Sequence, residues 1–129
     1  MLAFAIPYTG TVRPEVIVVE AGHARVEMAD RRRNRNHLDS VHAIAIANIG
    51  ELATGLALTA MLPPDMRSIL TALHIAYKKK GRGRLAAECR CVVPDVTEPI
   101  ELAVSSMVTN AAGEEVALVT ATWRLSPAP

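Results

Sequence analysis

Two titratable side chains near the middle of the chain could take part in acid–base chemistry, His42 and Glu51, and the polar Asn36 precedes them. Glu51 lies within NHLDSVHAIAIANIGELATG (residues 36–55), which is almost continuously apolar after His42. A buried carboxylate without a partner is costly, and desolvation raises its pKa. Glu51 is therefore either a structural group that is hydrogen-bonded to Thr54 or a neighbouring loop, or a carboxylate that acts as a general base or nucleophile.

The segment that carries Glu51 is predicted to be one long helix, from about residue 41 to about residue 60. Ala and Leu favour a helix, Asp39 or Ser40 can cap its start, and a Pro-Pro pair follows its end. Gly50 and Gly55 weaken a helix, so they indicate a close approach of another backbone.

The helical geometry separates His42 from Glu51. They are nine residues apart, which places them about half a turn out of phase and roughly 13 Å apart along the axis. One chain therefore cannot bring them together as an acid–base pair. If they act together, Glu51 must meet the His42 end of a second chain, which predicts a site shared across a dimer.

Strand-like alternation is expected in six other segments. These are residues 11–20, 23–30, 68–80, 83–95, 99–110 and 114–125. The first two are predicted to form a hairpin, and the last four, separated by turn signals, favour an antiparallel sheet. Because a helix that is apolar nearly all round must be covered on most sides, we expect a single α+β domain over residues 1–129. In this domain a curved antiparallel sheet wraps around one central helix.

Composition and charge exclude several classes of function. The formal net charge is +1 and only 3% of the residues are aromatic, so we predict no nucleic-acid partner. No apolar run reaches about 18 residues, and the start lacks the basic region of a signal peptide. We therefore predict a cytoplasmic protein with no membrane partner. The C-x-C pair Cys89 and Cys91 is expected to be reduced and structural, His23 and His74 are also expected to be structural, and no metal site is predicted.

The spacing of Asn36, His42 and Glu51 at the start of an Ala/Leu/Gly helix resembles that of the hotdog-fold acyl-CoA thioesterases. The most similar branch is the phenylacetate-degradation type and its uncharacterised bacterial relatives. The order of two strands, a helix and four strands also fits, so the resemblance covers nearly the whole chain. The sequence departs from the family pattern in having His-Ala-Ile at 42–44 where His-Gly-Gly is usual, and Glu51 where Asp is commoner.

The resemblance implies a role for each motif residue. Glu51 would activate water or attack the thioester carbonyl, and Asn36 would orient the attacking water or the partner chain's acid. The backbone N–H of Ala43 would bind the oxyanion, for which a helix N-terminus is suited. His42 would help to place the thioester. The Cβ of Ala43 and the bulk of Ile44 narrow the approach.

Two basic runs are candidates for holding the phosphates of coenzyme A, which would be part of the substrate rather than a cofactor. The first contains Lys78, Lys79, Lys80, Arg82 and Arg84, and residues 31–35 could join it. The alternative for each run is a solvated turn.

The sequence thus predicts an acyl-CoA hydrolase that is a homodimer or homotetramer. A non-catalytic hotdog module that binds an acyl-CoA or another small apolar ligand, or a purely structural dimer, remains open. A hydratase or dehydratase fits less well, because the spacing from His42 to Glu51 does not resemble the dehydratase pattern.

Overall fold

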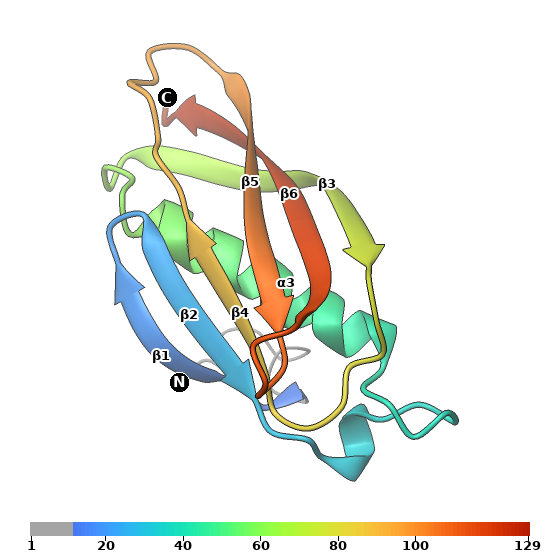
Figure 1. Ribbon diagram of the computed structural model, residues 1–129. Helices are drawn as coiled ribbons and strands as arrows, with labels where there is room; N and C mark the ends of the chain where they lie inside the picture. The colour runs from blue at the N-terminus through green and yellow to red at the C-terminus, as the bar shows by residue number, and fades with distance from the viewer. Residues whose placement is uncertain (1–11) are drawn as a thin grey trace.

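In the computed structural model, which describes residues 12–129, one α-helix lies against a six-stranded antiparallel sheet (Figure 1). The helix is α3 (Ala43–Thr59), and a 3-10 turn, η1 (Arg32–Asn34), precedes it. The strands are β1 (Glu15–Glu20), β2 (His23–Met28), β3 (Met66–Tyr77), β4 (Leu85–Arg90), β5 (Ile100–Thr109) and β6 (Glu115–Pro127). The sheet order is β1-β2-β4-β5-β6-β3. Within residues 12–129, no helix is long and apolar enough to cross a membrane.

The predicted fold class and the helix are confirmed, and the sheet curves around α3 (Figure 1). The predicted hairpin is also confirmed, with Gly22 at φ +75° in its turn. Strand ends differ from the predictions: β1 begins at Glu15, β3 ends at Tyr77 and β4 ends at Arg90. The predicted strand start at residue 11 lies outside the described residues.

The connection between β3 and β4 is not the hairpin turn that the consecutive strands suggested. Among the described strands β3 pairs with β6 alone, whereas β4 pairs with β2 and β5. The connection instead crosses the start of α3, where the carbonyl of Gly81 accepts a hydrogen bond from the Val41 N–H. A Cβ at Gly81 would lie 2.9 Å from Leu85 Cδ1 and 3.1 Å from Ile46 Cδ1. The connection must therefore pack tightly on the core, which turn propensity alone does not indicate.

The two helix glycines lie where α3 meets β6. The predicted close approach of another backbone is wrong at both positions, because the nearest neighbours are side chains. A Cβ at Gly50 would lie 2.4 Å from Val119 Cγ2, and one at Gly55 would lie 3.3 Å from the Trp123 ring. The carbonyl of Gly50 also accepts a hydrogen bond from the Ser106 hydroxyl, at 2.8 Å. Gly50 thus fixes the distance between the helix and the sheet.

The cysteine thiols belong to the apolar interior. Cys89 is fully buried in β4 and Cys91 is half-buried just after it. Burial raises the pKa of the Cys89 thiol to about 12, so this side chain stays a neutral thiol. This agrees with the structural role predicted for it.

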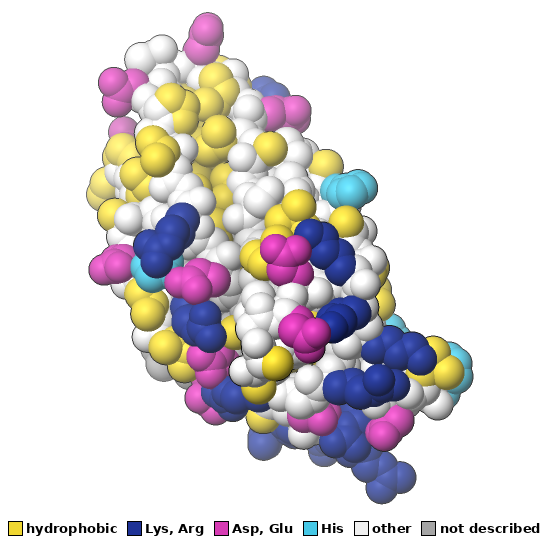
Figure 2. All heavy atoms as spheres, in the orientation of Figure 1, with side chains coloured by type: hydrophobic (Ala, Val, Ile, Leu, Met, Phe, Trp, Pro, Cys, Tyr) yellow, Lys and Arg dark blue, Asp and Glu magenta, His cyan; other side chains and the backbone are white. Residues whose placement is uncertain are grey.

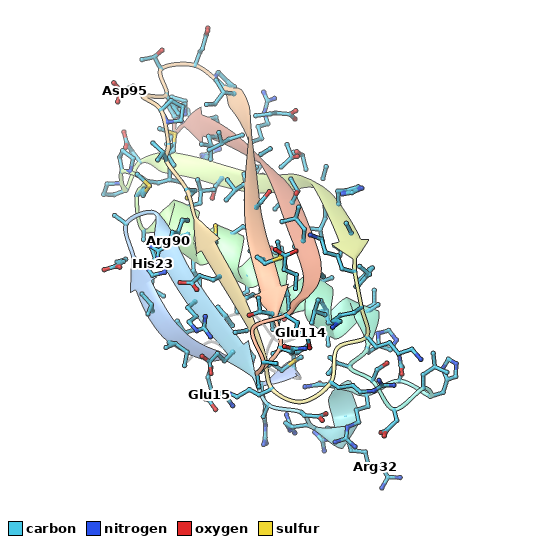
Figure 3. All side chains as sticks on the ribbon, viewed as in Figure 1. Glu15, His23, Arg32, Arg90, Asp95 and Glu114 are labelled. Carbon is cyan, nitrogen blue, oxygen red and sulfur yellow. The ribbon has the colours of Figure 1, made fainter. Side chains whose placement is uncertain are left out.

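An ion-pair network covers the face of β1, β2 and β4 that points away from the helix (Figure 3). His23 contacts Glu20 at 3.0 Å through Nδ1 and Glu88 at 2.6 Å through Nε2. Arg25 extends the network from Glu88 to Glu27. Hydrogen bonds to Glu20 and then Glu88 raise the pKa of His23 above its usual value.

This raised pKa predicts a pH dependence of stability. Because protonated His23 is favoured in the folded state, its stabilising contribution is complete below the ordinary histidine pKa of about 6.5 and is lost as the pH rises through the higher folded pKa. We expect wild type to lose more stability than His23→Gln between slightly acidic and slightly alkaline pH. Urea unfolding at several pH values measures this, and parallel curves for the two proteins would contradict it.

Candidate functional site

A pocket of about 300 Å³ opens at the start of α3 and brings several predicted site residues together. We call it the helix-start pocket. It is lined by Asn36, Leu38, Ser40, Val41, Ala43, Ile46, Tyr77, Lys78, Lys79, Lys80 and Gly81. The polar motif before the helix and the first basic run, which are far apart in sequence, therefore share one cavity.

The backbone N–H of Ala43 is available for an incoming group. No hydrogen bond from this N–H is formed within residues 12–129, whereas the neighbouring Ile44 N–H donates to His42 Nδ1 at 3.0 Å. Because Nδ1 accepts, the proton of neutral His42 lies on Nε2. The N-cap of α3 is thus His42 and not the predicted Asp39 or Ser40, because the helix begins later, at Ala43. The exposed Nε2–H of His42 remains a donor.

The departure from His-Gly-Gly affects the pocket less than the sequence indicated. Ala43 lines the helix-start pocket, but Ile44 does not and is 52% exposed. The side chain that would narrow the pocket is therefore the small Ala43 methyl group.

Asn36 organises the loop that precedes the helix. Its Oδ1 accepts hydrogen bonds from the Leu38 N–H, the Ser40 N–H and the Ser40 hydroxyl. The Nδ2 amide of Asn36 makes no hydrogen bond within the described residues. Asn36 can thus hold the loop with one atom and offer the other to a ligand in the pocket.

Glu51 lies on the least buried stripe of α3, together with Ile44, Gly55 and Thr59. Its carboxylate makes no hydrogen bond or ion pair within residues 12–129, and burial raises its pKa. The Thr54 hydroxyl donates instead to the backbone carbonyl of Glu51, at 2.7 Å, and accepts from Trp123 Nε1. The helix is thus fixed around Glu51 while its carboxylate stays unpaired, which argues against the purely structural interpretation.

The structure places Glu51 outside the helix-start pocket of its own chain. Asn36 and Ala43 line that pocket, and His42 caps the helix beside it. Glu51 is therefore separated from the helix-start residues, as helical geometry predicts. That Glu51 of one subunit acts together with the helix start of another stays a prediction.

The basic residues of the first run divide into three groups. Lys78 and Lys79 line the pocket, but each is paired with a carboxylate, Glu115 and Glu114 respectively. Lys80 lines the pocket and Arg82 is exposed, and within the described residues neither enters an ion pair. Arg84 points elsewhere: it binds Glu27 at 2.7 Å and Glu15 at 3.0 Å and lines a different cavity.

Tyr77 is a pocket residue that the sequence did not single out. Its hydroxyl donates to the carbonyl of Ala43 at 2.7 Å and thereby joins the end of β3 to the first turn of α3. Nothing in the local sequence indicates this contact, since it depends on β3 lying at the sheet edge beside the helix.

Two other features lie apart from the predicted residues. Within residues 12–129, no group of at least three His, Cys, Asp or Glu side chains is arranged to hold a metal ion. A larger pocket of about 430 Å³ lies between the residues after α3 and the β4–β5 connection, and it includes Met61, Met66 and Asp95. None of the predicted catalytic residues lines it.

Comparison with known proteins identifies the fold family. The family model described as a domain of unknown function, DUF4442, matches residues 1–125. No curated protein matches the chain.

Solved structures extend this comparison. The structural-genomics crystal structure APC5556 is 28% identical, with a TM-score of 0.92 over 99% of this chain and 86% of that one. PA5026 from Pseudomonas aeruginosa, described as a protein of unknown function and probable thioesterase, is 20% identical, with a TM-score of 0.86 over 97% and 90%. BH2602 from Bacillus halodurans, solved with CoA, is 25% identical, with a TM-score of 0.69 over 78% and 66%. The chain therefore belongs to the DUF4442 family and has the hotdog fold of thioesterase-like proteins.

Proposed function

We propose that this protein hydrolyses acyl-CoA thioesters, with Glu51 as the general base or nucleophile. The observation that carries the proposal is the half-buried carboxylate of Glu51, which has no partner among residues 12–129, on a helix whose neighbouring contacts are fixed. The likeness to a probable thioesterase and to a protein solved with CoA supports the substrate class. The spacing of Asn36, His42 and Glu51 favours the phenylacetate-degradation type within this fold, and we expect a cytoplasmic enzyme.

In the general-base form of the reaction, the Glu51 carboxylate takes a proton from water while the water oxygen attacks the thioester carbonyl carbon. The carbonyl oxygen becomes an oxyanion that the Ala43 N–H stabilises. Collapse of this intermediate breaks the carbon–sulfur bond, and the proton passes from Glu51 to the thiolate of CoA. In the nucleophilic form, the Glu51 carboxylate attacks the thioester carbonyl carbon, the carbon–sulfur bond breaks and CoA leaves as the thiolate. Water then hydrolyses the mixed anhydride, which regenerates Glu51 and releases the acid and the proton that the thiolate takes up.

A second subunit would complete the site, because Glu51 lies outside the helix-start pocket of its own chain. Within the part of the chain that the structure describes, β3 is an edge strand that pairs with β6 alone, and it exposes Ile69, Leu73 and Tyr77. An exposed apolar edge strand of 12 residues is suited to pairing with a copy of itself. The expected assembly is a homodimer, or a homotetramer built from it.

Lys80 and Arg82 are the best placed residues of the first basic run to hold the CoA phosphates, because within the described residues they have no carboxylate partner. Lys78 and Lys79 would first have to leave Glu115 and Glu114. Arg84, which is held by two carboxylates, is the least available.

The test is a thiol-release assay of purified protein against short, medium, long and aromatic acyl-CoAs, alongside CoA binding by calorimetry. Release of CoA with at least one acyl class supports the proposal. Tight binding without any hydrolysis would identify a binding module instead. A protein that is strictly monomeric by analytical ultracentrifugation would contradict the shared site.

Asn36 offers a second prediction, because its two side-chain atoms have separate roles. Asn36→Asp keeps the acceptor that holds the loop but removes the Nδ2 donor. We expect kcat to fall by about 100-fold, in the range for a lost polar contact to the transition state, with little change in Tm. Asn36→Ala should also lose about 1–2 kcal/mol of stability, since the Ser40 donors are left without an acceptor. Wild-type kcat in the Asn36→Asp variant would contradict the proposed contact of Nδ2 and would show that Asn36 has a structural role alone.

A further inference from the structure

The basic side chains are concentrated at one end of the molecule, which we call the basic end and define as residues 30–39 and 78–84. Nine of the 14 Lys and Arg residues of the chain lie there, against two of the 13 Asp and Glu residues. Because the formal net charge is only +1, the rest of the chain is acidic. Figure 2 shows the Lys and Arg side chains gathered at the lower right.

The fold creates this charge separation by joining two segments that are distant in sequence. The Val41 N–H donates to the Gly81 carbonyl at 2.7 Å, and the Gly83 N–H donates to Asp30 Oδ2 at 3.2 Å. The two basic loops therefore lie side by side. In Figure 3, Arg32 reaches away from the body at the end opposite to Asp95.

Several of these cations are not neutralised. Arg32, Arg33, Lys80 and Arg82 are exposed, and none of them enters an ion pair with another described residue. Both acidic residues of the basic end are already engaged by Arg35: Asp30 at 2.7 Å and Asp39 at 3.4 Å. The available charge at this end is therefore positive.

An exposed apolar side chain stands beside these cations. Leu38 is 50% exposed, lies on the loop between η1 and α3, and lines the helix-start pocket. That loop protrudes from the body (Figure 1), and hydrophobic and histidine atoms stand at the edge of the basic region (Figure 2). Unpaired cations around a protruding leucine are the combination that binds anionic membrane surfaces, where the cations meet the headgroups and the apolar group enters the interface.

We propose that the basic end docks on an anionic lipid surface, with Leu38 inserted at the interface. The positive charge of the basic end favours an anionic lipid surface over a neutral one. Nucleic acid is a poorer fit because the basic end contains no Phe, Tyr or Trp side chain for stacking. The contact is peripheral, so it requires no membrane-spanning helix, but it replaces the prediction from sequence that the chain has no membrane partner. Vesicle binding can be measured whether or not the protein hydrolyses thioesters.

The test is co-sedimentation of the full chain with vesicles of phosphatidylcholine alone and of phosphatidylcholine mixed with phosphatidylglycerol. We expect binding to the mixed vesicles only, weakened by salt. Because a basic residue near an anionic surface contributes about 1 kcal/mol, Arg32→Gln with Arg33→Gln should weaken partitioning about 25-fold. Leu38→Ser should weaken it about fivefold.

The matched control is Arg67→Gln with Arg124→Gln, which removes two exposed arginines near the other end of β3. This control should bind like wild type. Absence of binding to the mixed vesicles, or equal losses in the control and the basic-end variants, would overturn the proposal. Retention of a duplex oligonucleotide at physiological salt by a protein that does not bind the vesicles would overturn it as well.

Discussion

Glu51→Gln is expected to lower kcat for thioester hydrolysis by about 1000-fold, within the range for removal of a general base or nucleophile. Gln has nearly the same shape as Glu but cannot accept the proton from water or form the anhydride. Thiol release under saturating acyl-CoA measures the loss. CoA binding should be unchanged, because the substitution leaves Lys80 and Arg82, the residues proposed to hold the CoA phosphates, in place.

The same substitution should leave stability unchanged or raise it. Burial raises the pKa of Glu51, so the folded state holds this proton more tightly than the unfolded chain. Stability therefore falls as the pH rises from the ordinary glutamate pKa through the folded one, and at neutral pH the charged group opposes folding. Gln removes this effect. Glu101→Gln, which changes an exposed carboxylate on β5, is the matched control and should alter neither kcat nor Tm. A Glu51→Gln variant that is both less stable and fully active would mean that Glu51 is structural.

Gly50→Ala is expected to lower the free energy of unfolding by about 2 kcal/mol, although Ala is the better helix former by about 1 kcal/mol. The added Cβ would lie 2.4 Å from Val119 Cγ2 and 2.7 Å from Val119 Cβ. Because the Cβ of Val119 is itself too close, a change of side-chain rotamer cannot relieve the clash, and the helix must move away from the sheet. Val119 is fully buried in β6, so the shift spreads into the core.

Gly55→Ala in the same helix is the control. Its Cβ would lie 3.3 Å and 3.4 Å from two atoms of the Trp123 ring, which a small movement of the ring can relieve. The gain in helix propensity should then offset the remaining strain, and Tm should stay within a few degrees of wild type. Urea unfolding of both variants measures the difference. Equal stability of Gly50→Ala and wild type would contradict the close packing of α3 on β6.

The fold was predictable from sequence because its signals are local. The apolar stretch that contains Glu51 predicts a helix with covered sides, and the alternating segments predict strands. The order of the strands was less accessible. The turn signals around Gly81 suggest a hairpin, but the chain there crosses the helix start, and that path depends on contacts of Gly81 with Ile46 and Leu85 that no local pattern encodes.

The candidate site was predictable only in part. The separation of His42 from Glu51 follows from helical geometry alone. The pairing of Lys78 and Lys79 with Glu115 and Glu114, and the diversion of Arg84 to Glu27, depend on strand register and could not be inferred from a basic run. The contact of Tyr77 with Ala43 and the contact between the two basic loops also depend on the tertiary structure, so a local sequence pattern could not predict them.

The most direct test of the shared site is complementation between two inactive variants. Asn36→Ala disables the helix-start half and Glu51→Gln disables the other half, so each variant alone should be nearly inactive. Co-expression with two different tags gives mixed dimers in which one of the two sites is intact. If the subunits pair at random, half of the dimers are mixed, so about a quarter of all sites are intact and the mixture should have about a quarter of wild-type kcat. Mixed dimers that are as inactive as the separate variants would contradict a site in which Glu51 of one subunit acts at the helix start of another.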